Sequence, residues 1–143
     1  MTIRAALADD AEAVVRLVSE YVDGLGQDIS FQDVETELAD PLEFYDVVLL
    51  AENGCVALRR IDDATCEMKR LYVRPHARGT GLGRQLAEAL LAEARARGYR
   101  RIVLDTLSAM ASAQTLYRSL GFRDTKPYRY NPLPGASFLE LEL

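Results

Sequence analysis

The feature that most limits the fold is a run of glycines between a stretch typical of a strand and a stretch typical of a helix. Residues 66–73 have the length and the pattern of a strand. Residues 81–97 place leucines and alanines at helical spacing, and Gly98 follows as a C-terminal stop. Residues 101–105 have the pattern of a second strand. A strand, a helix and a strand in this order predict a parallel, right-handed βαβ crossover.

The rest of the chain predicts further strands and helices around this unit. Asn53-Gly54 is typical of a hairpin turn, and Asp9 can cap a helix. The other expected elements are strands 2–6, 47–52, 55–60, 122–125 and 138–143, and helices 10–24, 31–38 and 109–120. We therefore expect the α/β class in its α+β form, a mixed and mostly antiparallel sheet with one parallel crossover and flanking helices. A length of 143 residues is typical of a single domain, here 1–143.

Composition excludes several classes of function. Lys and Arg number 17 against 22 Asp and Glu, which gives a net charge of −5. An acidic chain has no global field for nucleic acid or an anionic membrane, so we expect neither partner. One His and two Cys are too few for an ordinary zinc site, and we expect no metal. Because no apolar run resembles a signal peptide or a membrane span, we expect a cytoplasmic protein in which Cys55 and Cys66 are reduced and buried.

The segment from Arg78 to Arg84, Arg-Gly-Thr-Gly-Leu-Gly-Arg, has the properties of an anion site. Glycines let backbone amides approach a ligand closely, and the free amides at a helix N-terminus cradle phosphate oxygens. Arg74, Arg78 and Arg84 add positive charge beside the loop. The segment lacks the Gly-Lys-Ser/Thr of a P-loop and the glycine spacing of the dinucleotide fingerprint. The pyrophosphate of coenzyme A is a third ligand that such amides and arginines would bind.

Two blocks of the sequence carry a resemblance to a known family. The first is Leu71-Tyr72-Val73-Arg74-Pro75 followed by Arg78-Gly79-Thr80-Gly81-Leu82-Gly83, and the second is 113–122, Ala-Gln-Thr-Leu-Tyr-Arg-Ser-Leu-Gly-Phe. The first resembles the Gln/Arg-x-x-Gly-x-Gly/Ala signature, with its Val-x-Pro lead-in, of the GNAT family of N-acetyltransferases. The second resembles that family's helix ending in Leu-Tyr-x-x-x-Gly-Phe. The order of the expected elements also matches, so the resemblance covers essentially the whole chain.

The resemblance implies acetyl-CoA as the cofactor and direct transfer of its acetyl group to a primary amine. In the family, pantetheine lies like an added strand beside the strand that precedes the loop, and backbone groups there bind the oxyanion. The loop amides hold the pyrophosphate. The cofactor-binding residues implied on this sequence are Leu71, Tyr72, Val73, Arg78, Gly79, Thr80, Gly81, Leu82, Gly83 and Arg84.

The resemblance also implies two catalytic side chains, Glu67 and Tyr117. A base is needed because an unperturbed amine with a pKa of about 10.4 is mostly protonated at neutral pH. Glu67 matches the family's base, and strand alternation puts it on one face with Lys69 and Leu71. The alternative is that Glu67 only forms an ion pair with Lys69. Tyr117 matches the acid that protonates the leaving thiolate, and its alternative role is core packing in an apolar helical stripe.

Other positions leave alternatives open. Many family members carry Asn where this chain has Met110, so Ser108 or Ser112 is expected to replace that contact. Asp105 is either a second base or a loop carboxylate that accepts backbone hydrogen bonds. His76 is either a proton shuttle near the site or, as we expect of a lone His in a turn, a solvated surface residue.

The resemblance places the acceptor site between residues 21–38 and 128–137. Acids in the first segment favour a cationic amine, whereas Arg129 in the second suits a carboxylate. The acceptor is therefore a small amine, an amino-acid-like compound or a peptide amine, and the sequence also allows a homodimer. A function of a different class is a non-catalytic acyl-CoA-binding or regulatory module, because a fold does not fix a function.

Overall fold

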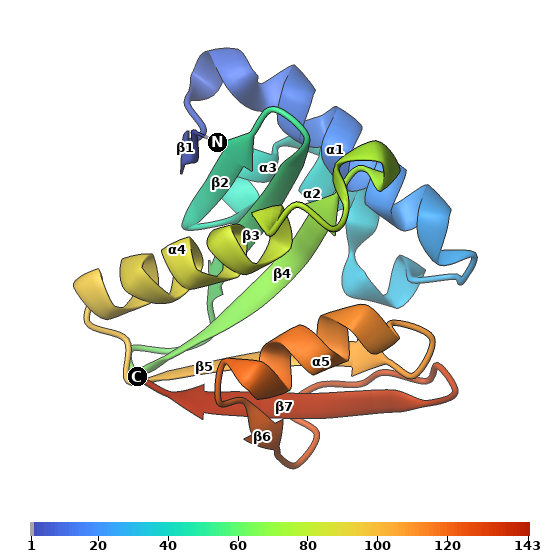
Figure 1. Ribbon diagram of the computed structural model, residues 1–143, viewed down its shortest axis with the longest axis vertical. Coiled ribbons are helices and arrows are strands. Elements are labelled where there is room, and N and C mark those ends of the chain that lie inside the picture. The colour runs from blue at the N-terminus through green and yellow to red at the C-terminus, as the bar shows by residue number, and fades with distance from the viewer. Residues whose placement is uncertain (1) are drawn as a thin grey trace.

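The computed structural model describes residues 2–143, which form one mixed sheet with helices on both faces (Figure 1). Its seven strands lie in the order β1-β2-β3-β4-β5-β7-β6. The strands are β1 (Arg4–Ala5), β2 (Val47–Ala51), β3 (Gly54–Arg60), β4 (Thr65–Val73), β5 (Arg101–Leu107), β6 (Arg123–Asp124) and β7 (Ala136–Glu142). The α-helices are α1 (Ala11–Leu25), α2 (Val34–Ala39), α3 (Pro41–Phe44), α4 (Leu82–Ala96) and α5 (Ala111–Ser119), and the 3₁₀ turns are η1 (Ala8–Asp10), η2 (Ser30–Gln32) and η3 (Pro75–Ala77).

The predicted fold class is confirmed. Strand β4 runs parallel to β5 with α4 between them in the chain, and every other strand pairing within residues 2–143 is antiparallel. The parallel crossover therefore occurs where the glycine-rich segment predicted it.

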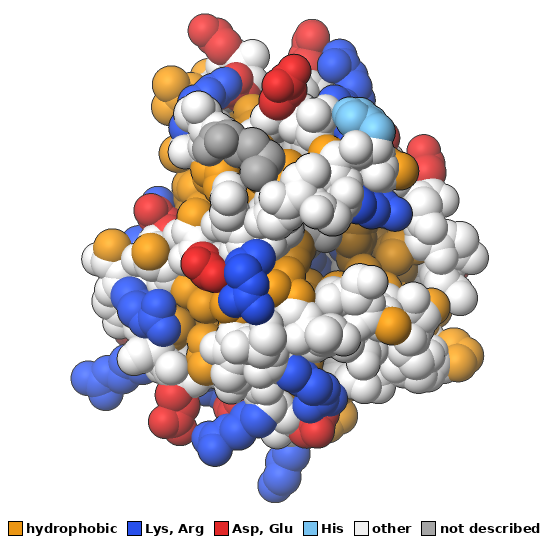
Figure 2. All heavy atoms as spheres, viewed as in Figure 1, with side chains coloured by type: hydrophobic (Ala, Val, Ile, Leu, Met, Phe, Trp, Pro, Cys, Tyr) orange, Lys and Arg blue, Asp and Glu red, His pale blue; other side chains and the backbone are white. Residues whose placement is uncertain are grey.

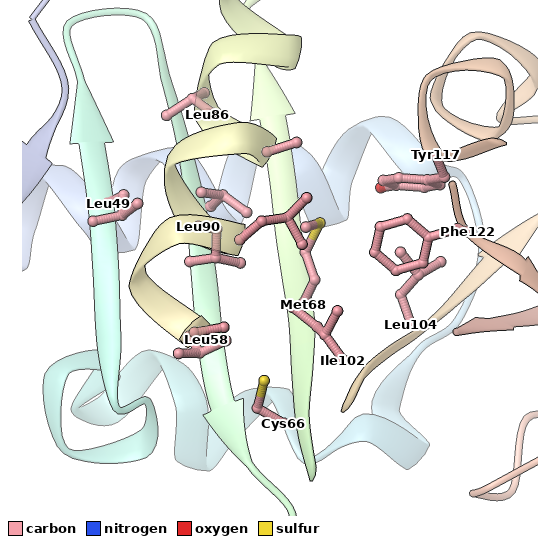
Figure 3. Packing of buried hydrophobic residues seen from close by; sticks show 14 of the residues in the cluster. Leu49, Leu58, Cys66, Met68, Leu86, Leu90, Ile102, Leu104, Tyr117 and Phe122 are labelled. Atoms are coloured by element: carbon pink, nitrogen blue, oxygen red, sulfur yellow. The ribbon is translucent and has the colours of Figure 1, made fainter. Parts of the chain in front are cut away.

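Two apolar clusters hold the helices on the two faces of the sheet. On one face, Leu86 and Leu90 of α4 are fully buried in a cluster that also holds residues of β2 to β5 and α5 (Figure 3). On the other face, Val14 and Val18 of α1 pack with residues of β2 and β3. Burying one such leucine or valine contributes roughly 1.5–3 kcal/mol, so both layers are anchored by the amphipathic patterns of their helices.

Cys55 and Cys66 are both free and buried, one in each apolar cluster. Burial raises the pKa of each thiol to about 12. Both thiols are therefore protonated at neutral pH and act as small apolar side chains.

The parallel pair β4 and β5 separates partway along its length. Pairing ends at Glu67 and Val103, although β4 continues to Val73 and β5 to Leu107. Figure 1 shows the two strands diverging beyond this point, with α5 beside β5. The divergence leaves the backbone groups at the end of β4 free of a neighbouring strand on that side.

The predicted helix 31–38 is interrupted in the structure. It is replaced by the short elements η2 and α2, because Asp33 ends η2 in the left-handed conformation, with φ at 63°. That conformation is uncommon for a residue other than glycine and breaks a helical run. The break brings Gln32 and Glu37 into the interior, where they are 7% and 0% exposed.

Two other helix boundaries differ from the sequence expectation. Helix α1 continues through Gly24 to Leu25, with Gly26 as its C-cap, and α5 begins after Met110 without a cap from Ser108. Within residues 2–143, no helix combines the length and apolar character needed to cross a bilayer.

Candidate functional site

A cavity lies where β4 and β5 diverge; we call it the inner cavity. Its walls come from the second half of β4, the end of β5, the end of α1, η2, α5 and the segment before β7. The lining residues are Tyr21, Leu25, Ile29, Gln32, Met68, Lys69, Arg70, Leu71, Asp105, Thr106, Leu107, Met110, Tyr117, Asn131 and Leu133. The structure thus brings both expected acceptor segments, 21–38 and 128–137, to one place.

A second depression, the outer groove, leads away from the inner cavity. It is lined by the end of β4, the start of α5 and Arg78, and it shares Tyr21, Leu25, Leu71 and Met110 with the inner cavity. Figure 2 shows the surface hollowed to the right of centre, with hydrophobic side chains in its depth. The two depressions form one path from the loop before α4 to the split in the sheet.

The glycine loop ends in a set of free backbone amides. Gly79 and Gly81 have φ of 80° and 87°, a conformation that favours glycine. Within residues 2–143, the amides of 79–84 donate to no protein acceptor, whereas the next amide, Gln85, donates to the Gly81 carbonyl at 3.1 Å. A Cβ added at Gly79 or Gly81 would meet no atom within 4 Å, so the space beside the amides is open. These amides and the helix dipole behind them fit a phosphate group.

Of the three arginines expected near the loop, Arg78 is the one available for an anion. Arg74 pairs with Glu20 at 3.0 Å, and Arg84 pairs with Glu88 at 3.2 Å. Arg78 has no carboxylate partner within residues 2–143, and its Nε donates to the Val73 carbonyl at 3.0 Å. The positive patch expected from three arginines is therefore reduced to one arginine, because the charges of Arg74 and Arg84 are paired with glutamates.

A bulge in β4 changes which side chains share a face. Arg70 has φ of 58°, and the register with β3 shifts opposite it. Lys69 and Arg70, neighbours in sequence, both donate to the Gln32 amide oxygen, at 3.2 and 3.0 Å. Leu71 instead packs in the cluster on the α4 side. The expectation that Glu67, Lys69 and Leu71 share one face is therefore wrong for Leu71, because one extra residue reverses the alternation.

The Glu67 carboxylate is buried and already has partners. It is 3% exposed, and its Oε2 accepts hydrogen bonds from Tyr128 at 2.5 Å and from Arg129 at 2.9 Å. The ion pair considered from the sequence, with Lys69, does not form, because Lys69 turns to Gln32. Burial and the charge of Glu67 raise the pKa of the Tyr128 hydroxyl far above its usual range, which keeps it a donor. Glu67 is not among the residues that line the inner cavity.

Tyr117 lies at the inner end of the path. Its ring is 6% exposed and packs against Phe122 with the ring centres 5.8 Å apart (Figure 3). Its hydroxyl has no hydrogen-bond partner within residues 2–143, although Tyr117 lines the inner cavity. Burial, followed by the neighbouring Tyr21 and Asp105, raises the pKa of this hydroxyl well above its usual range. The group is thus a protonated donor without a protein acceptor.

Asp105 is a carboxylate that does line the inner cavity. It lies on β5 near its end, and its Oδ2 accepts a hydrogen bond from the Asn131 side-chain nitrogen at 3.0 Å. The Asn131 oxygen accepts from the Leu133 amide at 3.1 Å, which fixes the orientation of the Asn131 amide. Asp105 therefore has one oxygen held and one oxygen without a protein donor within residues 2–143.

The remaining sequence candidates separate into near and distant groups. Met110 lines both depressions, and Ser112 lines the outer groove, whereas Ser108 lies against Gly135. His76 is exposed in η3, in agreement with its interpretation as a surface residue.

The charges at the acceptor segments differ from the sequence expectation. Of the acids in 21–38, none lines the inner cavity, and Glu37 is buried in an ion pair with Arg70 at 2.8 Å. Arg129 is occupied by Glu67. Sequence reasoning missed Lys69 and Gln32 as lining residues. Two adjacent cations in a strand pattern are the signal that could have indicated a bulge, because regular alternation would place one of them in the apolar core.

Comparisons of the sequence with known proteins show which family it resembles. The sequence profile described as the Acetyltransferase (GNAT) family matches residues 12–122. An uncharacterized N-acetyltransferase of Schizosaccharomyces pombe is 39% identical over 148 aligned residues, covering 96% of this chain and 91% of its own. An IAA acetyltransferase of Azospirillum brasilense is 42% identical over 78 residues, covering 54% of this chain and 51% of its own.

Solved structures have the same fold. A Klebsiella pneumoniae protein assigned as an acyl-CoA N-acyltransferase superposes with a TM-score of 0.77 at 28% identity, over 99% of this chain and 97% of its own. The Salmonella typhimurium protein YncA, solved with its cofactor acetyl-CoA, gives a TM-score of 0.74 at 27% identity, over 99% of this chain and 93% of its own. The profile match, the relatives and the split sheet lead to one conclusion: the chain belongs to the acetyltransferase (GNAT) family.

Proposed function

We propose that the protein is an acetyl-CoA-dependent N-acetyltransferase that moves an acetyl group directly to a primary amine. The observation that carries this proposal is the path from Arg78, next in sequence to the free amides of 79–84, along the outer groove to the inner cavity, where the Tyr117 hydroxyl has no partner within residues 2–143. The acetyl-CoA held by the Salmonella typhimurium relative supports the cofactor, and the name of the Schizosaccharomyces pombe relative supports the reaction.

The residues along the path fit the parts of this cofactor. The open amides of 79–84 and the Arg78 guanidinium suit a pyrophosphate. The unpaired edge of β4 at Leu71, Tyr72 and Val73 suits the amide groups of a pantetheine arm, as an added strand would pair there. When bound, acetyl-CoA supplies the acetyl thioester for the transfer.

Two side chains of the inner cavity are suited to move the protons. Tyr117 Oη can donate its hydrogen to the sulfur of the leaving group, because it is protonated and has no competing acceptor. Asp105 lines the cavity, has one oxygen without a protein donor within residues 2–143, and can take a proton from the acceptor amine. Glu67, the base that the family resemblance implies, can take part through a bridging water, since Tyr128 and Arg129 occupy its Oε2.

Coenzyme A binding to the loop is tested with two glycine variants. Gly81→Val places a β-branched residue at a φ of 87° beside the free amides, and Gly98→Val places one at a φ of 86° at the other end of α4. Both variants carry similar backbone strain, but we expect only Gly81→Val to lose the rise in melting temperature with coenzyme A. That rise is several degrees for a ligand at roughly 100 times its Kd.

Two outcomes contradict different parts of the proposal. If coenzyme A does not raise the melting temperature of the unmodified protein, the anion site is wrong. If it does, but acetyl-CoA and a panel of amines release no free thiol, the protein is a binding module and not an enzyme.

The two carboxylates are distinguished by paired substitutions. Asp105→Asn is expected to lower kcat/KM at neutral pH by roughly 10- to 100-fold, since it removes the base but keeps the bond to Asn131. The loss should shrink at higher pH, where more of the amine is already deprotonated. Glu67→Gln is expected to cost less activity. The opposite ranking, measured with the same amine, would assign the base to Glu67.

A further inference from the structure

The buried charges near the inner cavity are mostly cancelled by partners within the protein. Arg70 and Glu37 form a two-bond ion pair at 2.8 and 2.9 Å. Arg129 and Glu67 form another at 2.9 Å. These two pairs leave no net charge, so they give the inner cavity no preference for a charged ligand.

Lys69 and Asp105 are the charges that remain at the inner cavity. Lys69 is 5% exposed, and the Gln32 amide oxygen, 3.2 Å from Nζ, is its hydrogen-bond partner within residues 2–143. Asp105 has Asn131 as its partner. Both residues line the cavity, and within the described chain no ion pair of 4.0 Å or less joins them. The inner cavity thus has one cation and one anion on its wall, each without an opposite charge in contact.

We propose, building on the acetyltransferase function above, that the acceptor is an α-amino acid whose carboxylate binds Lys69 while its amino group faces Asp105. A buried ammonium group whose partner is one neutral amide oxygen is costly, and a ligand carboxylate would compensate it. The same ligand would place its amine beside the carboxylate that takes the proton. Leu25, Ile29 and Leu133 also line the cavity and suit an apolar side chain.

The environment of Lys69 agrees with this role. Burial lowers the pKa of Lys69 to about 8, with the charge of Glu67 opposing the shift. The other charged groups that act on it are Arg70 on its own strand, Arg129 on the loop and Asp105 on β5. At neutral pH Lys69 is still mostly protonated, so it can bind an anion. Binding of a carboxylate should weaken as the pH rises above about 8, since deprotonation removes the charge.

The first experiment measures selectivity between matched acceptors. We expect leucine to be acetylated with a kcat/KM at least roughly tenfold above that of isoamylamine, which is leucine without its carboxylate, and above that of leucinamide. Lys69→Met and Lys69→Gln should bring the ratio of leucine to isoamylamine close to one. Lys126→Met, which removes an exposed lysine outside the inner cavity, should keep the ratio. Melting temperatures establish that each variant is folded.

The second experiment tests the carboxylate site without any transfer. N-acetylleucine has the carboxylate but no amine, and it should raise the melting temperature of the protein, but not that of Lys69→Met or Lys69→Gln. Equal acetylation of leucine and isoamylamine would overturn the inference and leave the acetyltransferase function standing. Lys69-dependent binding of N-acetylleucine with no thiol release from any amine would support the carboxylate site and reject the enzyme.

Discussion

Arg70→Met is expected to lower the free energy of unfolding by about 3–5 kcal/mol, because it leaves a carboxylate buried without its cation. Glu37 is 0% exposed and accepts two hydrogen bonds from the Arg70 guanidinium, at 2.8 and 2.9 Å. Its further partner is the Tyr45 hydroxyl, which is neutral. A methionine fills much of the arginine's volume. The loss of unfolding free energy therefore measures the effect of the unpaired charge and not the effect of a cavity. Urea denaturation of both proteins measures it.

Two further variants show whether burial is the cause. Glu37→Gln combined with Arg70→Met removes the charge but keeps an acceptor for Tyr45, so the double variant should be more stable than Arg70→Met alone. Arg74→Met breaks a partly exposed pair with Glu20, whose side chain is 34% exposed, and should cost less than about 1 kcal/mol. Similar losses for Arg70→Met and Arg74→Met would contradict the argument.

The parts of the fold that sequence predicted well depend on local patterns. The glycines at 79, 81 and 83 are close together in sequence, between the end of a predicted strand and the start of a predicted helix. The chain has to change direction there, and Gly79 and Gly81 do so with positive φ. The helical spacing of leucines in α4 predicts its buried face directly. The parallel crossover then follows from chirality, without knowledge of distant contacts.

The bulge in β4 could not be located in this way. Strand alternation assumes one residue per position, and Arg70 takes an extra position with φ of 58°. In this conformation the Arg70 side chain pairs with Glu37, which lies 33 residues earlier in the chain. Glu37 in turn reaches the interior because Asp33 interrupts the predicted helix. Each step depends on another that is distant in sequence.

The partners of Glu67 are distant for the same reason. Its carboxylate is held by Tyr128 and Arg129, 61 and 62 residues later, from a segment without regular secondary structure. A family resemblance can indicate where on a strand a residue lies. The side chains that surround that residue depend on how the irregular segment with Tyr128 and Arg129 folds, which the resemblance does not indicate. The sequence could therefore nominate both Glu67 and Asp105, but it could not indicate that Asp105 lines the inner cavity and Glu67 does not.

Tyr117→Phe is expected to lower kcat by roughly 10²–10³-fold and to leave the KM for the amine within a few-fold, because the lost atom acts on the leaving group. The substitution removes only the hydroxyl, and the ring contact with Phe122 stays. Since burial holds the pKa of this hydroxyl well above its usual range, it is protonated throughout the working range. The fold loss should therefore be the same at about pH 6 and about pH 9, whereas the loss of a base would depend on pH.

Tyr99→Phe provides the matched control for this prediction. The Tyr99 hydroxyl donates to Asp46 at 2.6 Å and lines neither the inner cavity nor the outer groove. Its removal alters stability but not the path from loop to cavity. If Tyr117→Phe and Tyr99→Phe lower kcat equally, the hydroxyl of Tyr117 has only a packing role. If Tyr117→Phe raises the KM for the amine without lowering kcat, the hydroxyl binds the acceptor and does not act on the leaving sulfur.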